Sequence, residues 1–123
     1  MGEGILVIGA GLVGSLLALF LARLGLAVQL VERHADPRPG GVAGGRSINL
    51  TICERGFAAL DRVQAGHAVR AISVPCYGRV IHNRDGSVEY QPYGNRGEAI
   101  HSVSRHRLNG TLLDLALERP EIR

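Results

Sequence analysis

The stretch GILVIGAGLVG, residues 4–14, decides the fold class of this chain. Its apolar, β-branched start is typical of a buried parallel strand. Gly9, Gly11 and Gly14 follow with the spacing GxGxxG, and the apolar run that continues to Gly25 predicts a helix capped by that glycine. In such a turn the first glycine permits the bend, the second lets backbone approach a pyrophosphate, and the third allows close packing of helix on strand.

A second strand, LAVQLVE at residues 26–32, completes a βαβ unit and ends in an acid. Glu32 follows Gly14 by 18 residues, where a carboxylate can accept hydrogen bonds from both ribose hydroxyls of a dinucleotide. A carboxylate also repels a 2′-phosphate, so this site disfavours NADP and leaves FAD and NAD open. The start of the predicted helix offers N–H groups to the phosphates.

The rest of the chain predicts a loop, a short helix, a hairpin around the turn NRDG, a strand and a final helix. The N-cap of that helix is Ser104, and Pro120 ends it. The last residues, RPEIR, resemble the approach to another strand, so we expect the chain to be the front end of a longer protein. The predicted elements after the first unit cover residues 33–47, 54–64, 76–82, 87–93, 98–104 and 104–119.

Composition excludes several classes of function. A chain of 123 residues with 46% hydrophobic residues fits one domain, and its net charge of +3 comes from dispersed arginines, which disfavours nucleic acid as a partner. The uncharged residues 4–22 could span a membrane, but three glycines break them into strand, turn and helix. Cys53, Cys76 and the five histidines lack metal-ligand spacing, so we expect a cytoplasmic protein with reduced thiols and no metal.

Five segments follow one another in a specific order along the chain: VIGAGLVGSLLALFLARLG (7–25), GRSINLTICERGFAAL (45–60), GRVIH (78–82), YQPYG (90–94) and SVSRHRLNGTLL (102–113). Together they resemble the N-terminal part of the kynurenine 3-monooxygenase family of single-component aromatic flavin hydroxylases. The resemblance spans about residues 5–123, and GRSINL, followed in order by PYG and SVSR, is its most specific part. GRSINL also argues against an NAD domain, which would continue with helix and parallel strand.

The resemblance implies a set of FAD-binding residues. The glycine turn and Val13 would lie against the FAD pyrophosphate. Glu32 would hold the adenosine ribose, and the segment at Leu50 and Thr51 would lie beside the flavin. His34 departs from the arginine that relatives usually have near the adenosine, which would weaken cofactor affinity. The full set is Gly9, Gly11, Val13, Gly14, Glu32, Arg33, Arg46, Leu50, Thr51 and Arg105.

The resemblance also implies a substrate site. Arg79 and Tyr93 match the pair that grips the amino-acid carboxylate of the substrate; an arginine offers a planar fork of donors and a tyrosine adds a neutral donor. The implied reaction converts L-kynurenine to 3-hydroxykynurenine with NADPH and O2, in tryptophan catabolism and NAD biosynthesis. We assign no catalytic residue within the chain, because the cofactor carries this chemistry.

The expected fold is α/β, a Rossmann-like FAD-binding βαβ unit with an added β-hairpin and helices, incomplete at the C-terminus. Residues 1–123 would be the N-terminal portion of an FAD-binding domain and inactive alone. Three alternatives stay open: a flavin hydroxylase of another aromatic acid, a non-catalytic nucleotide-binding remnant, and an NAD-binding dehydrogenase domain.

Overall fold

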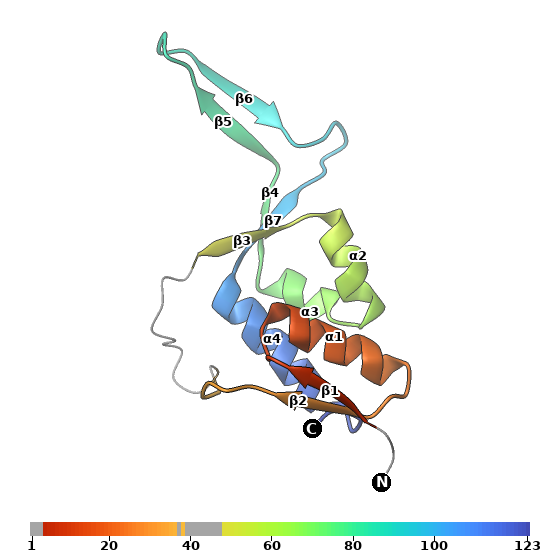
Figure 1. Ribbon diagram of the computed structural model, residues 1–123. Coiled ribbons are helices and arrows are strands. Elements are labelled where there is room, and N and C mark those ends of the chain that lie inside the picture. Colours follow the sequence, from red (N-terminus) through yellow and green to blue (C-terminus); the bar gives the residue numbers. More distant parts are fainter. Residues whose placement is uncertain (1–3, 37, 39–47) are drawn as a thin grey trace.

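The first unit has the predicted order of strand, helix and strand: β1 (Ile5–Ile8), α1 (Leu12–Arg23) and β2 (Val28–Val31). The structure is a computed structural model that describes residues 4–36, 38 and 48–123 (Figure 1). The two strands pair in parallel over their whole length. The C-cap of α1 is Leu24, one residue before the predicted Gly25. Gly25 follows it with a φ of +76°, in the left-handed region that glycine tolerates, and so turns the chain back toward β2.

The last residues of the chain extend this sheet. The Val28 N–H donates to the Glu121 carbonyl at 2.8 Å, and the Arg123 N–H donates to the Val28 carbonyl at 3.0 Å. Ile122 forms a parallel bridge with Val28 and is itself buried. β2 therefore lies between β1 and the C-terminal residues, and RPEIR does lead into a strand position, as its sequence suggests.

A second, antiparallel sheet occupies the middle of the molecule. Its central strand is β7 (Ile100–Ser104), flanked by β3 (Asn49–Ile52) and β4 (Val74–Cys76). Between β3 and β4 the chain forms α2 (Glu54–Arg62) and α3 (Gly66–Ala71). The sequence predicted one helix over 54–64; instead it ends at Arg62, a turn follows, and a second short helix begins.

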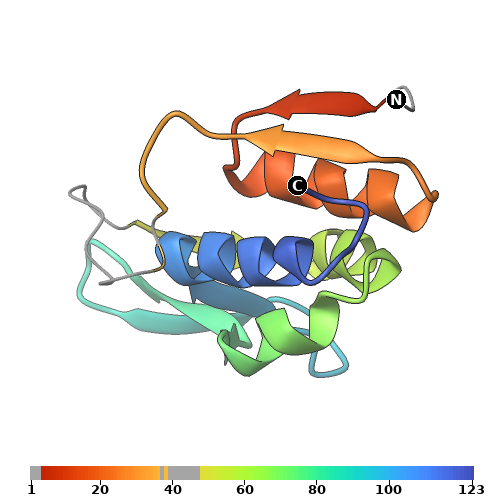
Figure 2. The same ribbon diagram turned by 90° about the horizontal axis from the view of Figure 1, so that it is seen from below.

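The final helix, α4 (Arg105–Leu117), packs against α1 and joins the two sheets into one core. Figure 2 shows β1 and β2 on one side of α1 and α4 on the other. The Ser104 hydroxyl caps α4 by accepting the Arg107 N–H, as predicted for an N-cap. The core that these elements share includes Val7, Ala18, Leu19, Ala22, Val28, Phe57, Leu60, Val69, Val103, Leu108, Leu112, Ala116 and Ile122.

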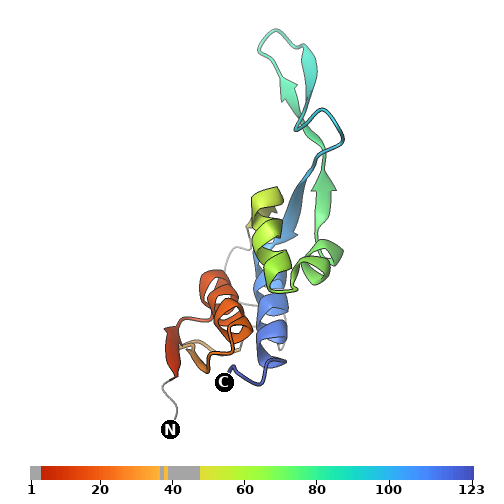
Figure 3. The ribbon, with the colours of Figure 1, turned by 90° about the vertical axis from the view of Figure 1, so that its right-hand side faces the viewer.

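The predicted hairpin consists of β5 (Gly78–His82) and β6 (Val88–Pro92) and projects away from the core (Figures 1 and 3). Its turn is closed by the Gly86 N–H, which donates to the Asn83 carbonyl at 3.1 Å, and Gly86 has the positive φ that the Asp-Gly signal anticipates. The register pairs Arg79 with Gln91 and Val80 with Tyr90. Both faces of the hairpin are largely exposed among the described residues.

Candidate functional site

The glycine turn that joins β1 to α1 is tightly packed at Gly14 and open at Gly11. A Cβ added at Gly14 would lie 1.8 Å from the Gly9 carbonyl oxygen, so only glycine lets α1 approach β1 this closely. A Cβ added at Gly11 would meet no atom of the described residues within 4 Å. Gly14 therefore serves packing, whereas Gly11 keeps the space before the start of α1 clear.

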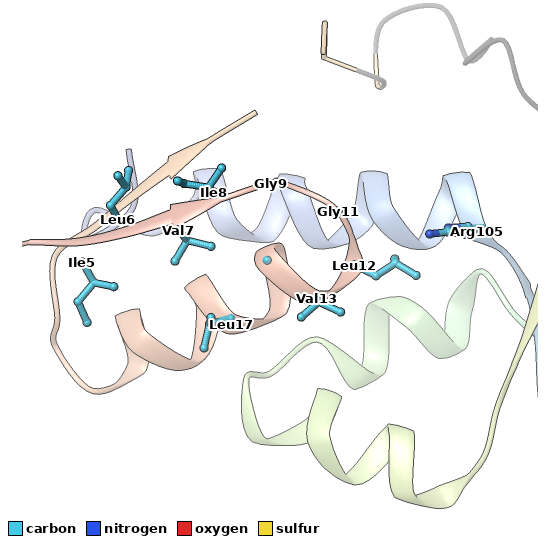
Figure 4. A pocket seen from close by; sticks show the side chains of 11 residues that line it. Ile5, Leu6, Val7, Ile8, Gly9, Gly11, Leu12, Val13, Leu17 and Arg105 are labelled. Atoms are coloured by element: carbon cyan, nitrogen blue, oxygen red, sulfur yellow. The ribbon is translucent and has the colours of Figure 1, made fainter. Parts of the chain in front are cut away.

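That space is part of an open cleft of about 610 Å³. Its lining brings together predicted residues from two distant parts of the chain: Gly9, Gly11, Val13 and Gly14 from the first unit, and Arg105 from the start of α4. Figure 4 shows the Arg105 side chain extending toward the glycine turn. A cation at a helix N-terminus is unfavourable with the helix dipole, so an anion held in this cleft would stabilise Arg105 there.

Glu32 is hydrogen-bonded to the same turn. Its Oε2 accepts the Ala10 N–H at 2.9 Å, while its Oε1 accepts the backbone N–H and the Nδ1–H of His34, each at 2.9 Å. These bonds, chiefly the one from the His34 backbone, lower the pKa of Glu32 to about 2. The acid is thus fixed beside the glycine turn in its ionised form, with Ala10 holding one carboxylate oxygen and His34 the other.

We expect the Glu32 side chain of this chain to titrate near pH 2 in carboxyl-carbon NMR. Because the folded-state pKa lies below the ordinary value of about 4.5, the stability that ionised Glu32 contributes is complete above that pH and is lost as pH falls toward 2. His34→Ala should raise the midpoint only in part, since both backbone donors remain. A midpoint near 4.5 in the parent chain would contradict this geometry.

The remaining predicted cofactor residues are Leu50, Thr51, Arg33 and Arg46. Leu50 and Thr51 lie on β3, opposite Val103 and Ser102 of β7. Because β7 leads directly into Arg105, β3 runs beside the start of α4. Arg33 directly follows Glu32 and is exposed. Arg46 lies outside the residues that the structure describes.

Arg38 is a structural contact that sequence reasoning missed. Its Nε–H donates to Asp36 at 2.8 Å and one terminal nitrogen donates to Asp114 of α4 at 2.9 Å, which fastens the segment after β2 to α4. The hydrogen bonds from Arg38 lower the pKa of Asp36 to about 2. The close pair Asp36 and Arg38 was visible in the sequence, but nothing local points to Asp114.

Arg79 and Tyr93 lie on the hairpin, at the other end of the molecule from β1 and β2 (Figure 1). The Tyr93 N–H donates to the Tyr77 carbonyl at 2.9 Å, which continues the β5–β6 register by one more pair. Side chains alternate between the faces of a hairpin, so Arg79, Gln91 and Tyr93 share one face. Arg79 and Tyr93 are diagonal neighbours there, a separation that long side chains can bridge.

A family model described as an FAD binding domain matches residues 4–120, nearly the whole chain. The chain belongs to this family of FAD binding domains. Among curated proteins it is 45% identical over 118 residues to the kynurenine 3-monooxygenase of Cytophaga hutchinsonii, and the match covers 94% of the chain and 26% of that protein. It is 48% identical to the Salinispora arenicola enzyme of the same name, over 98% of the chain and 27% of the relative. The chain thus spans about a quarter of the length of these relatives.

Solved structures show the same fold. The chain matches 2-methyl-3-hydroxypyridine-5-carboxylic acid oxygenase with a TM-score of 0.78 at 22% identity, over 99% of the chain and 32% of that protein. It matches p-nitrophenol 4-monooxygenase of Pseudomonas putida with a TM-score of 0.77 at 21% identity, over 98% of the chain and 30% of that protein. The predicted α/β FAD-binding fold and the predicted family resemblance are both confirmed.

The structure also bears on whether the uncharged residues 4–22 form a membrane-spanning helix. In the described ranges, no helix combines the length and the apolar character that crossing a bilayer requires, and α1 ends after 12 residues.

Proposed function

We propose that residues 1–123 are the N-terminal portion of the FAD-binding domain of a monooxygenase that hydroxylates L-kynurenine to 3-hydroxykynurenine with NADPH and O2. The observation that carries the proposal is the cleft in which the glycine turn, the start of α1 and Arg105 meet beside Glu32. The relatives named kynurenine 3-monooxygenase support the choice of substrate.

The residues of the cleft fit an FAD molecule. The open space at Gly11, the N–H groups at the start of α1 and the Arg105 guanidinium suit a diphosphate, and Val13 lines the same cleft. A carboxylate offers about four acceptor sites, so beside the three bonds it already accepts Glu32 keeps one site, on Oε2, for a ribose hydroxyl. Arg33 would lie at the adenosine, and Leu50, Thr51 and Arg46 along the flavin side.

FAD supplies the redox chemistry that adds an oxygen atom from O2 to an aromatic ring, with NADPH as the electron donor. The protein's part is to bind and orient. Because the Glu32 carboxylate repels a 2′-phosphate, NADPH is a co-substrate that binds away from the ribose site beside the glycine turn. Arg79 and Tyr93 would hold the carboxylate of L-kynurenine and so direct its aniline ring.

The proposal is tested on the full-length protein, expressed from the complete reading frame that contains codons 1–123. We expect it to purify with FAD and to form 3-hydroxykynurenine when given L-kynurenine and NADPH, as measured by liquid chromatography. Anthranilate and 4-hydroxybenzoate serve as competing aromatic acids. A reading frame without the remaining three quarters, or a preference for another acid, would refute the proposed substrate and reaction.

Glu32→Ala in the full-length protein should raise the dissociation constant of FAD by about 10- to 150-fold, the loss expected for charge-assisted hydrogen bonds. Turnover at saturating FAD should largely recover, because the ribose end is remote from the reacting carbon. Flavin titration by fluorescence quenching measures the constant. Glu118→Ala, an exposed acid at the end of α4, is the matched control, and equal constants for both variants would remove Glu32 from the ribose site.

A further inference from the structure

We infer that Gln91 is a positioning residue for substrate recognition: its amide oxygen holds the Arg79 guanidinium ready for the substrate carboxylate. The inference rests on the proposed function of Arg79. Its basis is one contact across the hairpin, where the Arg79 Nε–H donates to Gln91 Oε1 at 2.7 Å. The two residues are direct partners in the β5–β6 register, so the backbone ladder itself sets them opposite each other.

The chemistry of this contact suits a carboxylate site. A guanidinium only donates hydrogen bonds, so the amide oxygen of Gln91 must face it. Gln91 accepts the Nε–H, and within the described ranges the Arg79 side chain makes no other hydrogen bond. The terminal nitrogens are therefore left for a two-pronged carboxylate contact.

The neutrality of Gln91 matters as much as its position. An acid opposite Arg79 would compete with the substrate carboxylate for the same cation, whereas an amide fixes the guanidinium and leaves its charge uncompensated. No salt bridge to Arg79 occurs within the part of the chain that the structure describes. Gln91 therefore orders a flexible, exposed side chain before substrate arrives, which reduces the entropy lost on binding.

The opposite face of the hairpin cannot provide such a contact. The Tyr90 ring lies across Gly78, where an added Cβ would come within 2.5 Å of it, and Val80 pairs with Tyr90 on that face. By strand alternation, Arg79, Gln91 and Tyr93 share the polar face. The recognition residues are thus gathered on one side of the hairpin, where Gln91 lies directly opposite Arg79 and two residues before Tyr93.

The test is Gln91→Met in the full-length protein, which keeps a long side chain and removes the acceptor. We expect the dissociation constant of L-kynurenine, followed by flavin absorbance, to rise about 3- to 10-fold. FAD content should match the parent. The control is Val88→Met on the same strand, which pairs with His82 on the opposite face, leaves the charge near Arg79 unchanged and should bind L-kynurenine like the parent.

Two further measurements separate positioning from a structural role. Kynuramine, which has hydrogen in place of the carboxylate, should bind equally to the parent and to Gln91→Met. In an Arg79→Met background, adding Gln91→Met should change L-kynurenine binding by less than 2-fold, because no donor remains at position 79 for Gln91 to hold.

Each result decides a different question. If the parent full-length protein does not bind L-kynurenine, the proposed function fails and the inference with it. If the parent binds but Gln91→Met binds equally well, the inference alone is wrong. Lost FAD, or weakened binding of kynuramine as well, would show that Gln91 supports the fold instead of orienting Arg79.

Discussion

Gly14→Ala is expected to destabilise the fold by about 3 kcal/mol or more, at or above the upper end of what overpacking a core normally costs. The added Cβ would lie 1.8 Å from a backbone carbonyl oxygen, so no side-chain rotation can relieve the contact. Either α1 moves away from β1 or the glycine turn changes shape. Urea denaturation followed by circular dichroism, on this chain and on the full-length protein, measures the loss.

Gly11→Ala is the matched control for this prediction. Gly11 has a φ of −75° and a ψ of −171°, which alanine adopts without strain, and its added Cβ meets no atom in the described part of the chain. Its stability should stay close to the parent's, while FAD affinity falls, because the methyl group occupies the space offered to the pyrophosphate. If Gly14→Ala unfolds at the parent's urea concentration, the close packing described here is wrong.

Arg79→Ala is expected to have the largest effect on substrate binding in the full-length protein, and Arg79→Lys the next. Lysine keeps the charge but loses the planar fork, so L-kynurenine affinity should fall about 10- to 150-fold, the worth of one good charged hydrogen bond. Tyr93→Phe should cost less, because it removes only a neutral donor. Binding is measured by flavin absorbance during titration with L-kynurenine.

FAD content is the internal control for these three variants, because the hairpin lies away from the glycine turn (Figure 1). We expect normal occupancy in all of them. An Arg79→Lys protein that binds L-kynurenine like the parent, or one that loses flavin, would show that Arg79 does not hold the substrate carboxylate.

The sequence predicted those parts of the fold that depend on local chemistry. The glycine spacing places the strand, turn and helix, Asp85-Gly86 places the hairpin, and Ser104 caps the final helix. The pairing of Arg79 with Gln91 could also have been found, because a turn over residues 83–86 fixes which residues lie opposite each other.

Other features depend on contacts that only the folded chain brings together. Gly66 starts α3, and a Cβ there would lie 1.7 Å from Asp61 Oδ1 of the preceding helix. Asp61 in turn pairs with Arg70 across the two short helices at 2.7 Å. The contact between Arg38 and Asp114 joins residues 76 positions apart, and no local pattern predicts it.

The parallel bridge between Val28 and Ile122 has a consequence for how the protein is made. The residues that complete the β2 pairing are separated from it by most of the chain, and contacts of such long sequence separation slow folding. During synthesis, the glycine turn, α1 and both strands leave the ribosome long before residue 122 does. β2, although near the start of the sequence, therefore gains this partner only after α4 has been translated.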